Sequence, residues 1–138
     1  MAENRRIMGI DPGTNYMGYG LIEIIDGKPQ PLVLGDIDLH KISDAHHKLR
    51  YIFERVQALV REYHPQEVAF ESPFFGTNVQ SMLKLGRAQG VAIAACMQAG
   101  LKVFEYSPLK IKMALTGNGG ASKEQVADML RRFLYIPL

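Results

Sequence analysis

The period of the hydrophobic pattern changes along this chain, and that change limits the possible folds more than any other feature. The N-terminal part contains short apolar runs that stop at Gly, Pro or Asp, a pattern typical of strands joined by tight turns. These runs are residues 7–10, 18–25 and 32–39, with Asp26 and Gly27 as a hairpin turn. We therefore predict an antiparallel meander of three strands.

A helical period follows the meander. Apolar side chains recur at helical spacing from residue 49 to residue 63, with Ser43 or Asp44 as the N-cap and Pro65 just beyond the end. The next elements predicted are a strand at 68–70, a helix at 78–98 and a strand at 103–106. Two further helices are predicted near the C-terminus, from Ser107 to about Leu115 and from a capping box at Ser122, with a glycine-rich segment at 116–121 between them.

The order of these elements favours an α/β fold. A strand followed by a helical crossover and another strand makes a parallel, right-handed connection, whereas the meander is antiparallel. The predicted fold is a five-stranded mixed sheet flanked by helices. The length of 138 residues suits a single domain spanning residues 1–138.

Two carboxylates stand where strands end. Asp11 closes the first strand and Glu71 closes the fourth. If these strands are parallel neighbours, both side chains emerge at one edge of the sheet, and we expect them within about 8 Å of each other, where they suit Mg²⁺ or Mn²⁺. The residues alone leave two plainer readings open: Asp11 as a turn-capping residue in Asp-Pro-Gly, and Glu71 as a solvated strand end.

Aromatic and cationic side chains follow these acids. Phe74 and Phe75 lie in a loop directly after Glu71, where they either stack on an unpaired base or fold back into the core. The net charge is only +2, so any nucleic-acid contact depends on where the cations lie. The candidates for phosphate contacts are Lys84, Arg87, Lys110, Lys112 and Lys123, for each of which a solvated surface position is the alternative.

The second helix carries small residues at a spacing of four. Gly86, Gly90 and Ala94 form a row that lets another backbone approach, either this chain's own sheet or a partner helix. Cys96, on the same helix, is expected to be a buried apolar residue, and as the single cysteine it can form no internal disulfide. With no signal-peptide pattern or apolar run of membrane-spanning length, the sequence favours a cytoplasmic protein.

Four groups of residues stand out as motifs. In chain order they are residues 9–14 (GIDPGT) with 18–20 (GYG); residues 69–71 (AFE) with Phe74 and Asn78; residues 84–92 (KLGRAQGVA); and Lys112 with Gly117, Gly119 and Lys123. In this order and spacing, from about residue 7 to the end, the chain resembles the RuvC family of Holliday-junction resolvases. These crossover junction endodeoxyribonucleases are metal-dependent nucleases of ribonuclease-H-like fold that cut four-way DNA junctions in recombination and repair.

The resemblance implies roles for these residues. Asp11 and Glu71 would be catalytic, metal-binding acids that hold Mg²⁺, with Mn²⁺ as an alternative, at two ions per subunit. The other positions would contact DNA, with Phe74 stacking on a base: Phe74, Asn78, Lys84, Arg87, Lys112 and Lys123. Residues 84–92 would belong to a dimer-forming helix, so that a homodimer cuts two strands symmetrically. The family also implies a branch-migration helicase complex as a partner.

The chain departs from the family pattern at its end. The family carries two further acids, in an Asp-x-x-Asp pattern, on a helix beyond the segment at which this sequence stops, and neither Glu124 nor Asp128 supplies that pattern. We therefore expect either an incomplete chain or an inactive form, and the apolar ending Ile136-Pro137-Leu138 favours the former.

Three other functions remain open on the sequence alone. Residues 9–14 also resemble the phosphate loop of actin-like and sugar-kinase-type nucleotide-binding proteins, although those proteins need two such domains. A related ribonuclease-H-like nuclease acting on RNA is the second alternative, and a non-catalytic junction-binding scaffold is the third. An Asp-x-x-Asp helix encoded beyond Leu138 would favour the enzyme over the scaffold.

Overall fold

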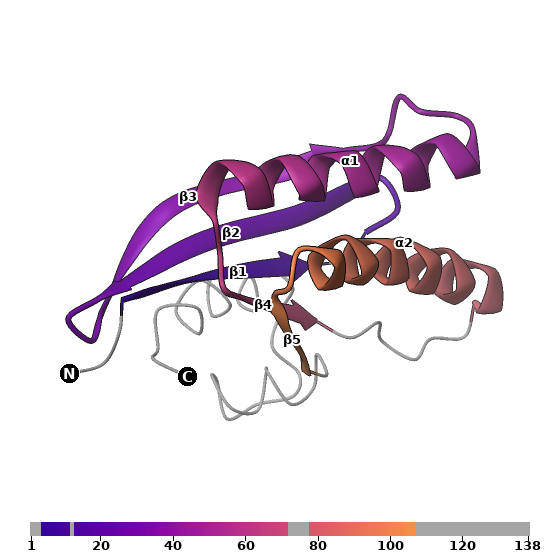
Figure 1. Cartoon of the computed structure of the whole chain (residues 1–138). Helices are drawn as coiled ribbons and strands as arrows, with labels where there is room; N and C mark the ends of the chain where they lie inside the picture. The colour runs from indigo at the N-terminus through magenta and orange to yellow at the C-terminus, as the bar shows by residue number, and fades with distance from the viewer. Residues whose placement is uncertain (1–3, 12, 72–77, 107–138) are drawn as a thin grey trace.

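The computed structural model describes residues 4–11, 13–71 and 78–106. Its elements follow the predicted strand and helix order (Figure 1). They are β1 (Arg5–Asp11), β2 (Tyr16–Ile25), β3 (Lys28–Asp38), α1 (Ala45–Tyr63), β4 (Glu67–Glu71), α2 (Val79–Gln98) and β5 (Lys102–Tyr106). The helices predicted after Tyr106 and the glycine-rich segment between them lie outside the described residues.

The five strands form one mixed sheet in the order β3-β2-β1-β4-β5. β1, β2 and β3 pair antiparallel, whereas β4 lies between β1 and β5 and is parallel to both. The hairpin between β2 and β3 turns at Asp26 and Gly27, which have φ of 52° and 77°. Positive φ at both positions is what a two-residue type I′ hairpin requires. The predicted meander, parallel crossover and turn are confirmed.

β3 begins earlier than the sequence pattern predicted. The strand starts at Lys28 rather than near Leu32, and its pairing with β2 includes Pro29 and Pro31. Proline lacks a backbone N–H, so it is tolerated mainly on edge strands. β3 is an edge strand of the described sheet, which explains why a segment that reads as a proline-containing turn pairs as a strand.

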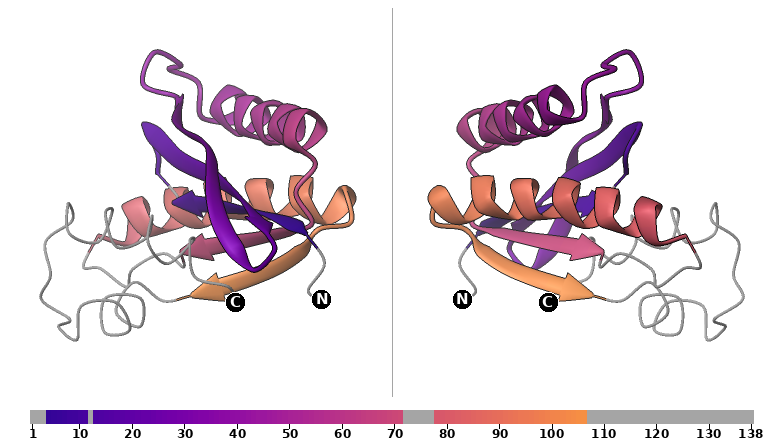
Figure 2. Two further views of the ribbon diagram at one scale, coloured as in Figure 1. Left: turned by 90° about the vertical axis from the view of Figure 1, so that its left-hand side faces the viewer. Right: turned by 90° about the vertical axis from the view of Figure 1, so that its right-hand side faces the viewer.

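Both described helices cover the same face of the sheet (Figures 1 and 2). Met8 and Ile10 of β1 and Phe70 of β4 belong to the core cluster that also contains residues of α1 and α2. Ile7 instead joins Ile22 and Ile24 in a small cluster separate from the main core. Because side chains alternate along a strand, residues that follow Ile10 and Phe70 point away from the helices.

Cys96 of α2 lies fully buried in the main core, as predicted. Burial disfavours the thiolate and raises the pKa of the thiol to about 12. The side chain therefore serves as a small apolar group rather than as a reactive thiol.

α1 is bounded by local hydrogen bonds. Of the two predicted N-caps, Asp44 is the one used: its carboxylate accepts a hydrogen bond from the backbone N–H of His47 at 2.9 Å, which lowers the pKa of Asp44. The helix ends at His64 in the left-handed conformation, with φ of 51°. Within the described residues, no helix combines the length and the apolar character needed to cross a membrane.

Candidate active site

The two predicted acids lie at the ends of neighbouring parallel strands. The pairing of β1 with β4 runs as far as Ile10 opposite Phe70, so Asp11 and Glu71 are the next residues along the same register. Neighbouring strands are about 4.8 Å apart. Since Ile10 and Phe70 are buried toward the helices, strand alternation directs both carboxylates to the opposite face of the sheet. This face, which carries neither α1 nor α2, is called the open face below.

The same row of the sheet brings a third acid into the neighbourhood. Asp11 pairs with Gly18 of β2, and Gly18 pairs with Asp36 of β3. A Cβ placed on Gly18 would lie 3.7 Å from the Asp11 Cβ and 3.6 Å from the Asp36 Oδ1. The sequence analysis missed Asp36 because its position depends on how β2 pairs with β3. Gly18, which has no side chain of its own, thus adds no atom between the two carboxylate side chains.

A buried amide holds the end of β4. Gln89 of α2 is only 5% exposed, and its Nε2 donates a hydrogen bond to the backbone carbonyl of Glu71 at 2.9 Å. This bond ties the strand end that carries the Glu71 carboxylate to the helix behind it. The sequence showed Gln89 only as part of a motif, since nothing local to residues 84–92 indicates a contact with residue 71.

We expect Gln89→Met to impair the site at Glu71. Methionine has similar size but no N–H donor, so the Glu71 carbonyl loses this bond, at a cost of about 1 kcal/mol in unfolding free energy. Mobility of the strand end should also weaken the binding of a metal ion at Glu71. Urea unfolding and a Mn²⁺ titration measure the two effects. Gln98→Met, at an exposed position of the same helix, is the control, and equal behaviour of the two variants would contradict this role.

The donor set fits a hard divalent cation. Mg²⁺ usually binds through one or two carboxylates together with waters and substrate phosphates. Asp11 and Glu71 supply two such carboxylates at the carboxyl ends of β1 and β4. Within residues 4–11, 13–71 and 78–106, no three His, Cys, Asp or Glu side chains are grouped closely enough to hold a metal ion. The described residues would therefore supply two ligands to the metal, and water or phosphate oxygens would be bound beside them.

The predicted DNA contacts on α2 lie in its N-terminal half. Asn78 is the N-cap of this helix, and its side chain accepts a hydrogen bond from the backbone N–H of Ser81 at 3.1 Å, a capping role that the sequence analysis did not assign. Lys84 and Arg87 are exposed. Arg87 and Lys84 lie two and five residues before Gln89, so both are within two helical turns of the residue that binds the Glu71 carbonyl. The predicted contacts at Phe74, Lys112 and Lys123 lie outside the described residues.

The small-residue row of α2 faces outward. Gly86, Gly90 and Ala94 are exposed, and a Cβ added to either glycine would meet nothing within 4 Å. Packing against the chain's own sheet therefore does not explain these residues. Leu83 and Met97 flank the row and are 61% and 58% exposed. An exposed apolar stripe of this kind is typical of a surface that another protein covers.

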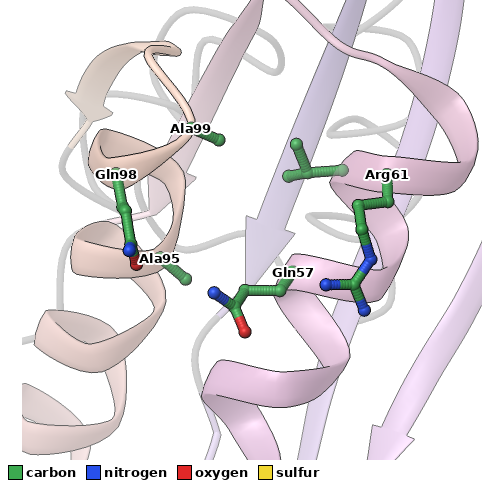
Figure 3. A pocket seen from close by; sticks show the side chains of 6 residues that line it. Gln57, Arg61, Ala95, Gln98 and Ala99 are labelled. Carbon is green, nitrogen blue, oxygen red and sulfur yellow. The ribbon is translucent and has the colours of Figure 1, made fainter.

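A pocket lies between α1 and α2 (Figure 3). Its lining residues come from the two helices and the residue after α2: Gln57, Val60, Arg61, Ala95, Gln98 and Ala99. None of them is a predicted site residue. The pocket lies among the helices, whereas Asp11 and Glu71 point to the open face.

Comparison with known proteins supports a single family. The family model described as "Crossover junction endodeoxyribonuclease RuvC" matches residues 7–138. A protein of that name from Bacteroides fragilis is 58% identical over 129 residues, which cover 94% of this chain and 69% of the relative. Its counterpart from Porphyromonas gingivalis is 53% identical over 135 residues, covering 98% of this chain and 71% of the relative.

Solved structures agree with the sequence comparison. Thermus thermophilus RuvC in complex with a Holliday junction substrate is 31% identical and has a TM-score of 0.79, over 97% of this chain and 82% of that one. Yeast mitochondrial Ydc2, a Holliday junction resolvase, is only 14% identical but has a TM-score of 0.66, over 96% of this chain and 63% of that one, a likeness of fold alone. The mixed sheet with its helices is thus the predicted ribonuclease-H-like fold. The chain belongs to the RuvC family of crossover junction endodeoxyribonucleases.

Proposed function

We propose that this protein is a metal-dependent endonuclease that cuts four-way DNA junctions. The observation that carries the proposal is the placement of Asp11 and Glu71 at the ends of adjacent parallel strands, directed to the open face. Membership of the RuvC family and the likeness to Thermus thermophilus RuvC bound to a junction support this substrate. Such an activity belongs to DNA recombination and repair in the bacterial cytoplasm, where the family implies a branch-migration helicase as partner.

The two acids would bind the metal, and neighbouring residues would keep the acids in position. Asp11 and Glu71 would bind Mg²⁺ or Mn²⁺, at two ions per subunit, through carboxylate oxygens. When bound, the metal lowers the pKa of a coordinated water and stabilises the charge that develops on the phosphate. Gln89 keeps the backbone at Glu71 in place, and Gly18 adds no side chain of its own beside Asp11.

DNA affinity would come from cations and aromatics around the acids. Lys84 and Arg87 on α2 are exposed and suit phosphate contacts. The family resemblance adds further contacts at Phe74, Asn78, Lys112 and Lys123. Because phosphate contacts dominate DNA affinity, binding should survive the loss of the metal-binding acids.

The outward row of α2 supports a homodimer. Two copies that met through Gly86 and Gly90 would bring their helices close together around a two-fold axis. Leu83 and Met97 would supply apolar area on either side of the small residues. Such a dimer would have two equivalent acid pairs, as symmetric cutting of two strands requires.

We expect Gly90→Leu to weaken the dimer without disturbing the monomer. Added atoms at Gly90 meet open space within one chain but would clash with a partner helix, which typically costs about 1–3 kcal/mol. Sedimentation equilibrium measures the dissociation constant. Glu54→Leu, which adds the same side chain to the exposed side of α1, is the control. A wild-type protein that stays monomeric at high micromolar concentration would rule out this interface.

The direct test of the function is nicking of a synthetic four-way junction by the full-length protein. The reaction is run in Mg²⁺ and in EDTA, with linear DNA duplex and an RNA duplex of matched sequence as competing substrates. Junction-specific nicking in Mg²⁺ alone is the expected result. Junction binding without nicking under all conditions would favour the scaffold, and preferred cutting of RNA would favour the related ribonuclease.

A further inference from the structure

An exposed aromatic pair lies beside the acid pair on the open face. Tyr16, the first residue of β2, is 53% exposed, and its ring stacks on His40 with ring centres 5.5 Å apart and planes 25° apart. The Tyr16 hydroxyl lies 3.3 Å from the His40 Nδ1. We call Tyr16 and His40 the aromatic platform.

The strand register places the platform near the acids. Gly18 pairs with Asp11, and Tyr16 lies two residues before Gly18 on the same strand, about 7 Å from Gly18. Met17 is fully buried in the core under the helices, so strand alternation puts Tyr16 and Gly18 on the open face. Tyr16 thus lies on the same face as Asp11, toward β3, whereas Glu71 lies toward β4.

Local contacts hold the platform in place. Asp38, which pairs with Tyr16 across the strands, bonds to both the side chain and the backbone N–H of His40, and these bonds lower the pKa of Asp38. The segment before Tyr16 is fixed as well. Asn15 accepts a backbone hydrogen bond from Leu39 at 2.7 Å, and the Lys48 ammonium of α1 donates to the Thr14 carbonyl at 3.3 Å. An exposed ring that is fixed in this way loses little conformational entropy when it binds a ligand.

The charges around the platform indicate which part of DNA it takes. Asp38 contacts the platform, and Asp36 lies one step along the same face of β3, so a phosphate next to the Tyr16 ring would be repelled. Two cations are near: Lys41 follows His40 outside the strand, and the Lys48 ammonium is held by the Thr14 carbonyl and the Asn15 side-chain oxygen. An uncharged base has no such penalty, and its flat surface suits an aromatic ring.

We infer that Tyr16, supported by His40, stacks on an unpaired base of the cut strand, within about two nucleotides of the phosphate that would be cut at the Asp11 and Glu71 site. This inference rests on the proposed function. It adds a base contact on the β2 side of the acids, besides the contact that the family resemblance implies for Phe74. The platform would thereby fix the register of the strand over the acids.

The test is a binding cycle with the full-length protein in EDTA, so that nothing is cut. Tyr16→Ala should weaken junction binding roughly five- to a hundredfold, as expected for the loss of one stacked base. Tyr16→Phe keeps the ring and should stay close to wild type. His40→Ala removes the support beneath the ring and should give a smaller loss in the same direction. Tyr51→Ala, an exposed tyrosine of α1, is the control and should change nothing.

Two further measurements identify the contact as a base. The effect of Tyr16→Ala should vanish on a junction with abasic sites in the two nucleotides next to the cutting point. The slope of log affinity against log salt should stay unchanged, because no phosphate contact is lost. A Tyr16→Ala variant that matches Tyr51→Ala, or an equal loss on the abasic junction, would overturn the inference. A wild-type protein that binds junction and linear duplex equally would instead overturn the proposed function.

Discussion

Asp11→Asn and Glu71→Gln are each expected to abolish cleavage of a four-way junction by the full-length protein, while junction binding stays within a few fold of wild type. Each change keeps the shape of the side chain but removes the charge that would hold the metal. A bound metal ion contributes several kcal/mol of transition-state stabilisation, so the rate should fall by about a thousandfold or more. Single-turnover cleavage and a gel-shift titration measure the two quantities.

The control for this pair is Asp36→Asn. Asp36 lies in the same row of the sheet, and Gly18 lies between it and Asp11. Removing its charge should change the cleavage rate far less than either of the first two substitutions. If binding and cleavage fell by the same factor in Asp11→Asn, the acids would be holding DNA rather than metal, and the proposed division of roles would be wrong.

Phe70→Ala is expected to have the largest effect on stability, lowering the unfolding free energy by about 3–5 kcal/mol. Phe70 is fully buried on β4, which lies between β1 and β5, and it joins the core shared by the sheet and both helices. Truncation leaves a cavity that the surrounding strands can only partly fill. A domain of this size has about 5–15 kcal/mol of stability in total, so the variant should be close to unfolding at physiological temperature.

Denaturant unfolding followed by circular dichroism measures this loss. Phe104→Ala on β5 is the matched control, because the same ring is 41% exposed there and its removal should cost much less. Phe70 directly precedes Glu71, so a milder Phe70→Leu variant that still folds should also show reduced cleavage. Equal losses of stability at positions 70 and 104 would contradict the packing described for β4.

Local sequence signals predicted most of the fold. The hairpin turn at Asp26 and Gly27, the cap at Asp44 and the end of α1 before Pro65 all follow from residues within a few positions of the feature. The start of β3 did not follow, because the prolines at 29 and 31 are acceptable only on an edge strand. The position of an edge depends on the order of all five strands, which no short segment determines.

Some residues of the candidate site could be predicted from the sequence and others could not. Asp11 and Glu71 could be paired from the sequence, because each closes a predicted strand and the crossover rule makes those strands parallel. Asp36, Gln89 and Tyr16 could not, because each reaches the site through strand register or a contact between a helix and a strand. The contacts at Phe74, Lys112 and Lys123 stay predictions from the family resemblance.

The bond from Gln89 to Glu71 has a geometric consequence for a dimer. Gly90 would contact the partner helix. The residue before it, Gln89, donates a hydrogen bond to the last residue of β4. In such a dimer, the path from the two-fold axis to each Glu71 would run through α2 and the Gln89 side chain. Such a connection would be rigid. The two cutting centres would stay at a fixed separation, so the junction would have to bend until its strands matched the protein's spacing.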